Sequence, residues 1–376
     1  MKRPPHYPDY VEPSAPQWRR WWLALLLLWG VQLGLTWALW PEGRPRQEQW
    51  PLGVIVPLAW LLALALRLLV WQVGLINRDA HRSTLEAALR GWWCRRGATL
   101  PVEHALLLGP AGDSSWQYQG LMAATPVPKP VVLPGSGELA LRCQVSLRQA
   151  EDRHAALGQH LARQLLALPE REARWSGWRG LAWVGDAAGE VSFAATLVAA
   201  GAQLPETRWR LRTLDDLDTL IDEFPRICPE EADGLLCAGV VSLAQAEEGA
   251  VPGEAGFAWV IGHRGQLQLH RGEYLLTDEE SAAELCAQMQ RYGRLDKAPA
   301  HCLALDAASH RAFIEGGWQA GEHQLSAHWG ALGPLAPFVG MSLALLQVKE
   351  SRQPCGWLCA QGEQGMAMGV AVHGNG

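Results

Sequence analysis

The sequence predicts an α/β protein with a mixed β-sheet, preceded by an N-terminal transmembrane α-hairpin. Two apolar runs, residues 21–40 and 51–73, are each long enough to cross a bilayer as a helix, which takes about 20 residues. Further on, short apolar segments typical of strands alternate with amphipathic helical segments. The chain closes on two strand-like segments, residues 355–360 and 366–372. We expect them to form a hairpin, which makes the sheet mixed.

Four regions follow from the composition. Residues 1–20 are rich in proline and predict an irregular tail, and residues 21–73 hold the two spans. Residues 74–99 alternate charged and apolar positions at helical spacing, which predicts an amphipathic connecting helix. Residues 100–376 remain, enough for one large domain or two closely joined halves.

Basic residues indicate how the hairpin is oriented. They are denser before the first span (Lys2, Arg3, Arg19, Arg20) and after the second than in the short break between the spans. By the positive-inside rule, the N-terminus and the large domain face the cytoplasm. A cleaved signal peptide is the alternative, but the first run is too long for one and a second span follows at once.

The overall composition excludes several kinds of site. The formal net charge is −6 and the basic residues form no stripe, so no nucleic-acid partner is expected. Eight cysteines are scattered through apolar segments, which favours buried thiols in a reducing compartment over disulfides. Cys355 and Cys359 lack a second pair or nearby histidines for zinc. Without a phosphate-binding or dinucleotide motif either, the sequence predicts no cofactor, no metal site and no residues that bind them.

Within the large domain, the sequence predicts the elements in order. The residues 125–134 are too rich in proline for a helix and predict a linker or sheet edge. Thr213 is expected to cap its helix, with Asp215 and Asp216 serving the helix dipole rather than a catalytic role. Strands are predicted at residues 104–108, 138–145, 180–184, 209–211, 234–241, 253–262 and 300–306, and helices at 150–168, 191–200, 213–224, 279–292 and 333–348.

From Thr213 onward the chain resembles the thiolase-like fold, in particular its β-ketoacyl synthase branch. Residues 231–241 read EADGLLCAGVV, and residues 253–261 read GEAGFAWVI, similar to two successive strands of that family. Residues 330–346 read GALGPLAPFVGMSLALL, similar to the glycine- and alanine-rich helix that follows its Gly-His turn. The resemblance implies a layered fold with mixed sheets, in which residues 100–200 would supply the first half.

The catalytic groups of that family are not matched. By position, the nucleophilic cysteine falls near Thr213, the first histidine near residues 306–309, starting at Asp306, and the Gly-His histidine at Ala331. A ketoacyl synthase needs a thiolate at a helix N-terminus and two imidazoles that stabilise the developing charge. The resemblance therefore implies a pseudoenzyme without catalytic residues.

Three functions fit these observations. Degenerate thiolase-like proteins occur beside effector genes of type VI secretion systems, and this chain is similar to the lipase-adaptor family there. That implies an adaptor in the bacterial inner membrane whose partner is a secreted effector or a spike component, with membrane lipid around residues 21–73. The alternative is a membrane-bound acyl-transfer or acyl-condensing enzyme with a displaced nucleophile, Cys237 or Cys302. A structural membrane component that oligomerises through the hairpin is the third.

Overall fold

The computed structural model divides the chain into two compact units, Pro4–Trp92, and Trp93–Gly376 together with Met1–Arg3. The described residues are 2–39, 50–112, 126–133, 137–145, 153–168, 178–246, 250–276, 280–318, 324–360 and 365–374.

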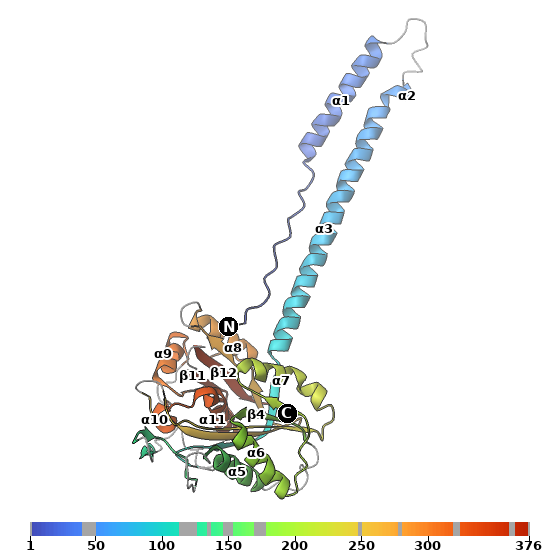
Figure 1. The fold of residues 1–376 in the computed structure, drawn as a ribbon. Coiled ribbons are helices and arrows are strands. Elements are labelled where there is room, and N and C mark those ends of the chain that lie inside the picture. The colour runs from blue at the N-terminus through green and yellow to red at the C-terminus, as the bar shows by residue number, and fades with distance from the viewer. Residues whose placement is uncertain are drawn as a thin grey trace. The chain divides into compact units, whose positions relative to one another are not determined.

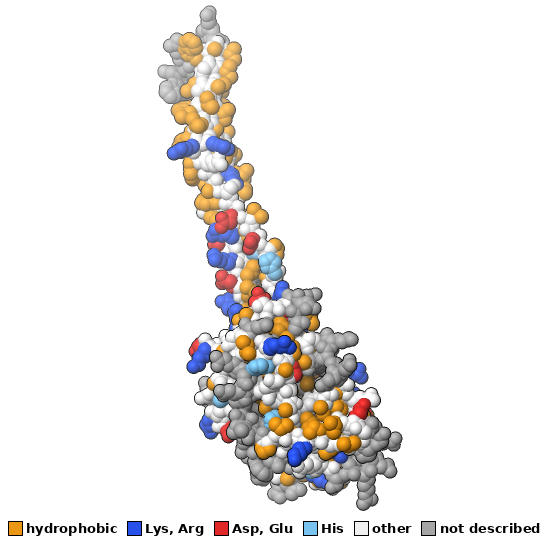
Figure 2. Space-filling model, turned by 90° about the vertical axis from the view of Figure 1, so that its left-hand side faces the viewer, with side chains coloured by type: hydrophobic (Ala, Val, Ile, Leu, Met, Phe, Trp, Pro, Cys, Tyr) orange, Lys and Arg blue, Asp and Glu red, His pale blue; other side chains and the backbone are white. Residues whose placement is uncertain are grey.

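The first unit contains α1 (Trp18–Ala38), the short α2 (Trp50–Gly53) and most of α3 (Ile55–Arg96). Two helices of the described chain are long and apolar enough to cross a bilayer, α1 and the one containing α3. Figure 2 shows apolar side chains along this unit and charged ones further along it. The Trp60 indole N–H donates to the Trp21 carbonyl at 2.9 Å, so α1 and α3 form the expected helical hairpin.

α3 continues without a break from the second apolar run through the amphipathic segment to Arg96, so the predicted connecting helix and the second apolar run are one helix. A helix of 42 residues is about 63 Å long at 1.5 Å per residue. That is about twice the thickness of a hydrocarbon core. The two sequence segments therefore differ in composition and not in backbone structure.

The second unit is built on a ten-stranded sheet in the order β10-β11-β12-β8-β1-β7-β6-β4-β5, with β9 also paired to β12. The two-residue strands β2 (Val131–Val132) and β3 (Leu139–Ala140) pair separately. The strands of the large sheet are β1 (Thr99–Leu108), β4 (Trp178–Gly185), β5 (Arg208–Arg210), β6 (Gly234–Ser242), β7 (Glu254–Gly262), β8 (Leu267–His270), β9 (Glu273–Leu275), β10 (His301–Ala304), β11 (Cys355–Ala360) and β12 (Met366–His373).

The sheet contains the same topology twice. In chain order, the five strands of the first half are β1, β4, β5, β6 and β7. In the sheet they lie side by side as β5-β4-β6-β7-β1, that is, third, second, fourth, fifth and first, and β7 is antiparallel to its neighbours. In the second half, β10-β11-β12-β8 repeats this order with β12 antiparallel to β11 and β8. The described residues contain no counterpart of β5 in the second half. The halves join through the antiparallel pair β1–β8. Residues before Thr213 supply β1, β4 and β5 of the first half, and β6 and β7 follow after it.

Side chains alternate between two cores across this sheet. On β6, Leu236, Ala238 and Val240 belong to a core shared with α5 (Arg153–Leu166) and α6 (Ala187–Ala199). Leu235 and Cys237 face the opposite core, which contains α7 (Leu214–Ile227) and α11 (Ala336–Ser351). Twelve residues of α11 are buried, because it contacts strands of both halves. Figure 1 shows α5 and α6 side by side.

Several short elements differ from the prediction. The strand expected over residues 138–145 is reduced to β3, and the helix expected from residue 279 begins at Ala282, where Ser281 caps α8 (Ala282–Tyr292). The elements β8, β9, α9 (Ala307–Glu315) and α10 (Ser326–Trp329) were not predicted. The two strands have only four and three residues, too few to show a periodic pattern.

Candidate functional site

The first candidate position is the start of α7, where Thr213 is the N-cap residue as predicted. Its hydroxyl accepts the Asp216 N–H at 3.3 Å, and Asp216 Oδ2 accepts the N–H groups of Arg212 and Thr213 at 2.8 and 3.0 Å. The Leu214 N–H donates to the Tyr274 hydroxyl at 3.0 Å. These four amides at a helix N-terminus are therefore bound within the protein, and none of them is free to stabilise an anion.

The second position follows β10. The Asp306 carboxylate accepts hydrogen bonds from the Ser309 N–H at 2.7 Å, the Ser309 hydroxyl at 2.6 Å and the Ala360 N–H at 2.5 Å. It thereby joins the start of α9 to the end of β11. Asp306 thus has a structural role where the resemblance places a catalytic histidine.

Thr213 and Asp306 lie in one neighbourhood, because β9 links them. Tyr274, which binds the start of α7, lies opposite Ala367 on β12, and Ala367 lies opposite Cys359 on β11. Cys359 precedes Ala360, whose amide Asp306 binds. The structure therefore brings together two of the three positions that the resemblance singled out.

The third position, Ala331, binds the residues before β7 through its backbone. Its N–H donates to the Val251 carbonyl at 2.8 Å, and its carbonyl accepts the Gly253 N–H at 2.9 Å. A methyl side chain offers no acid, base or nucleophile. Its contacts with residues 251–253 are a structural role in the loop before α11.

The cysteines follow the prediction of buried thiols, except that Cys94 is exposed on α3. Cys237 on β6 and Cys302 on β10 are fully buried. Burial raises the pKa of Cys237 well above its usual value, and it raises the pKa of Cys286 to about 12. Since the thiolate is the nucleophile, burial opposes the reactivity of the seven buried thiols.

A buried ionic cluster that the sequence did not reveal lies where α3 ends. Arg96 donates to Asp218 at 2.6 Å, to Glu273, and to the Tyr292 hydroxyl at 3.0 Å. Lys2 also donates to Asp218, at 2.9 Å. Burial opposes the charge of Arg96, but Glu273, Tyr292 and Asp218 together hold its pKa above the usual value. Residues 122 to 216 positions apart make these contacts, so no local pattern could signal them.

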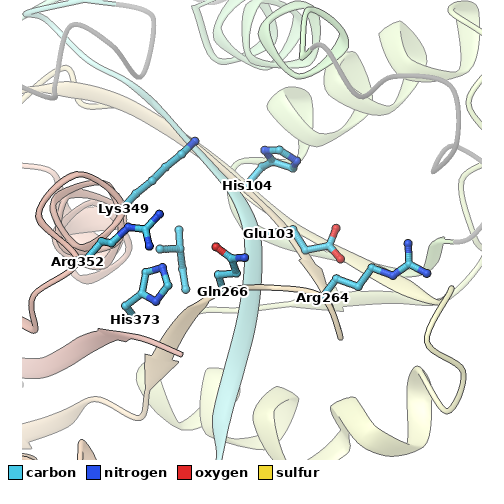
Figure 3. A pocket seen from close by; sticks show the side chains of 8 residues that line it. Glu103, His104, Arg264, Gln266, Lys349, Arg352 and His373 are labelled. Atoms are coloured by element: carbon cyan, nitrogen blue, oxygen red, sulfur yellow. The ribbon is translucent and has the colours of Figure 1, made fainter. Parts of the chain in front are cut away.

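The structure also has a pocket of about 400 Å³, shown in Figure 3. It lies between β1, the β7–β8 turn, the end of α11 and the end of β12. Its lining includes Glu103, Arg264, Lys349, Arg352 and His373. The sequence analysis singled out none of these residues, because they come from four separate segments.

The duplicated half-sheet, with α11 buried between strands of both halves, defines a thiolase-like fold. Solved structures agree. The ishigamide ketosynthase/chain length factor is 13% identical, with a TM-score of 0.54 over 74% of this chain and 100% of that one. The PfaC keto synthase-chain length factor is 9% identical, with a TM-score of 0.52 over 74% of this chain and 43% of that one.

Cerulenin-bound OleA of Xanthomonas campestris is also similar, at 10% identity and a TM-score of 0.44 over 73% of this chain and 96% of that one. No protein-family model and no curated protein matches the sequence. The sheet topology and the two solved structures with TM-scores above 0.5 confirm the predicted thiolase-like fold, and the likeness extends to the fold alone.

Proposed function

We propose that this chain is a membrane-anchored, catalytically inactive thiolase-like protein that acts as an adaptor for a protein partner. The observation that carries the proposal is the start of α7. Thr213 stands near where the resemblance places the nucleophile. The capping box with Asp216 and the Tyr274 hydroxyl bind four backbone amides there.

Chemistry supports inactivity at this position. A threonine hydroxyl needs a general base to become a nucleophile. The Thr213 hydroxyl lies 3.1 Å from Asp216 Oδ2, but that oxygen already accepts two backbone N–H groups. The second position carries the helix-capping Asp306 and the third carries Ala331, so neither supplies an imidazole to stabilise an oxyanion.

The proposal also includes a membrane location and a class of protein partner. The two long apolar helices hold the second unit at the bacterial inner membrane, with the N-terminus and that unit in the cytoplasm. The resemblance to the lipase-adaptor family of type VI secretion clusters indicates a secreted effector or a spike component as the partner. An adaptor needs a stable binding surface and no reactive centre, which fits a fold whose catalytic positions have structural roles.

The test has two arms. In the first, the full chain in detergent is incubated with acyl-coenzyme A and with acyl-carrier protein, and its intact mass is measured. We expect no acyl adduct on the wild type, on Thr213→Ala or on Cys237→Ala. An adduct on the wild type that either substitution abolishes would refute inactivity.

In the second arm, the tagged full chain is crosslinked in its own organism, and captured proteins are identified by mass. We expect a secreted effector or spike component, captured equally by Thr213→Ala. Capture of acyl-carrier protein instead, together with labelling of Cys237 or Cys302 by a thiol probe, would favour the acyl-condensing enzyme.

A further inference from the structure

The pocket of Figure 3 is rich in positive charge, although the chain as a whole carries a formal net charge of −6. Lys349 and Arg352 contribute two positive charges to its lining, and Arg264 contributes a third that is paired with Glu231 at 3.1 Å. Glu103 is the one carboxylate among the described lining residues. Among the described residues, no carboxylate pairs with Lys349 or Arg352. A cavity with unneutralised cations favours an anionic ligand.

Two local features of the backbone build this lining. Between Val102 and His104, β1 has a bulge opposite Val260 and Ile261 of β7, and Glu103 is the extra residue. A bulge redirects side chains, and here the consecutive residues Glu103 and His104 both line the pocket. On a regular strand, consecutive side chains would point to opposite faces.

The second feature is the end of α11. Lys349 and Arg352 are three positions apart, so they lie on the same side of the helix. Figure 3 shows the Arg352 side chain beside His373 and the Lys349 side chain extending away from it. Arg352 is the C-cap residue, with φ of 56° and ψ of 18°, a left-handed conformation. Glycine is the usual residue in that conformation, because a Cβ atom is strained there. Arginine at this position is therefore not explained by backbone geometry.

We propose that this pocket binds an anionic phosphate group through Arg352 and Lys349. Arginine and lysine are the common phosphate ligands in proteins, and the volume is within the range of small-ligand sites. The largely polar and charged lining does not suit an acyl chain. The phosphate belongs either to a soluble phosphate ester or to an anionic lipid headgroup.

The pocket is separate from the thiolase positions, so the inference does not depend on the proposed function. Ala331 precedes α11 and the pocket lies beyond its last turn, and a helix of 16 residues spans about 24 Å. Asp306 lies next to the start of β12 through β11, whereas His373 is the last residue of β12.

The test measures binding of two probes to the full chain in nonionic detergent by calorimetry: inorganic pyrophosphate and short-chain phosphatidylglycerol, with short-chain phosphatidylcholine as the uncharged comparison. We expect Arg352→Gly and Lys349→Gln each to weaken binding at least tenfold. Arg226→Gln, at an exposed arginine outside the pocket that pairs with Glu223, should change it less than twofold.

Arg352→Gly also separates binding from folding, because glycine relieves the left-handed strain. Its melting temperature should be equal to or above that of the wild type while binding is lost. Binding of pyrophosphate would assign a soluble ester, and binding of phosphatidylglycerol alone would assign a lipid headgroup. The proposal is wrong if neither probe binds the wild type, or if both pocket variants bind within twofold of it.

Discussion

Glu254, the first residue of β7, offers the sharpest test of how the second unit is held together. Its side chain is fully buried. It accepts hydrogen bonds from Arg142 at 2.6 Å, from Arg153 at 2.6 and 2.7 Å, from the Ser242 hydroxyl at 2.7 Å and from the Cys143 N–H at 2.9 Å. One carboxylate thus joins Arg142, Cys143 and Arg153 to the sheet.

Glu254→Gln keeps the shape of the side chain and removes its charge. The two guanidinium groups are mostly buried, at 14% and 15% exposure, and would lose their counter-charge. Leaving a buried charge without its partner costs about 3–5 kcal/mol. At about 2 °C per kcal/mol for a large domain, the melting temperature should fall by about 6–10 °C.

The assay is thermal unfolding of the full chain followed by circular dichroism, with Glu223→Gln as the matched control. Glu223 pairs with Arg226 at 3.1 Å, but Arg226 is 78% exposed, and exposed pairs contribute about 0–1 kcal/mol. If Glu254→Gln melts within 2 °C of Glu223→Gln, the reasoning about Glu254 is wrong.

Three further predictions concern buried contacts. Burial would raise the pKa of Glu254, but Arg153, Ser242 and Arg142 lower it below 4.5. The ionised carboxylate therefore stabilises the fold fully above that pH and less as the pH falls below it, so the difference in melting temperature between the wild type and Glu254→Gln should become smaller from pH 6 to pH 3. Arg96→Met leaves buried carboxylates short of a partner and should cost about 3–5 kcal/mol in urea unfolding, whereas the exposed Arg82→Met should cost under about 0.5 kcal/mol. Tyr274→Phe removes the acceptor for the Leu214 N–H and should cost about 1–3 kcal/mol by the same measurement; an unchanged midpoint would contradict the contact.

The sequence predicted the long, periodic elements well. The strands at residues 234–241 and 253–262 correspond to β6 and β7, and Thr213 caps α7 as expected. These elements are specified locally, by continuous apolar runs and by one capping residue. The strand order of the first half could not be predicted, because it depends on pairings between distant segments such as β1 and β8.

The candidate sites, too, could be predicted only in part. The resemblance located Thr213, Asp306 and Ala331 by their order along the chain. The structure adds that the Tyr274 hydroxyl binds the Leu214 N–H next to Thr213 and that the Ala360 N–H binds Asp306. The basic pocket and the Arg96 cluster could not be predicted, since each is assembled from segments that have no common pattern. The predicted connecting helix after residue 74 is continuous with the second apolar run in α3, although the hydrophobicity changes there.

The outermost strand of the first half, β5, affects whether two copies of this chain can pair through the border of the sheet. It is only three residues long, and an arginine lies on each side of Trp209. Short, positively charged border strands resist pairing with another sheet. Two copies meeting antiparallel through β5 would place Arg208 of one chain beside Arg210 of the other, and like charges directly opposite repel. The β5 border of the sheet is therefore protected from pairing with a neighbouring molecule by its own side chains.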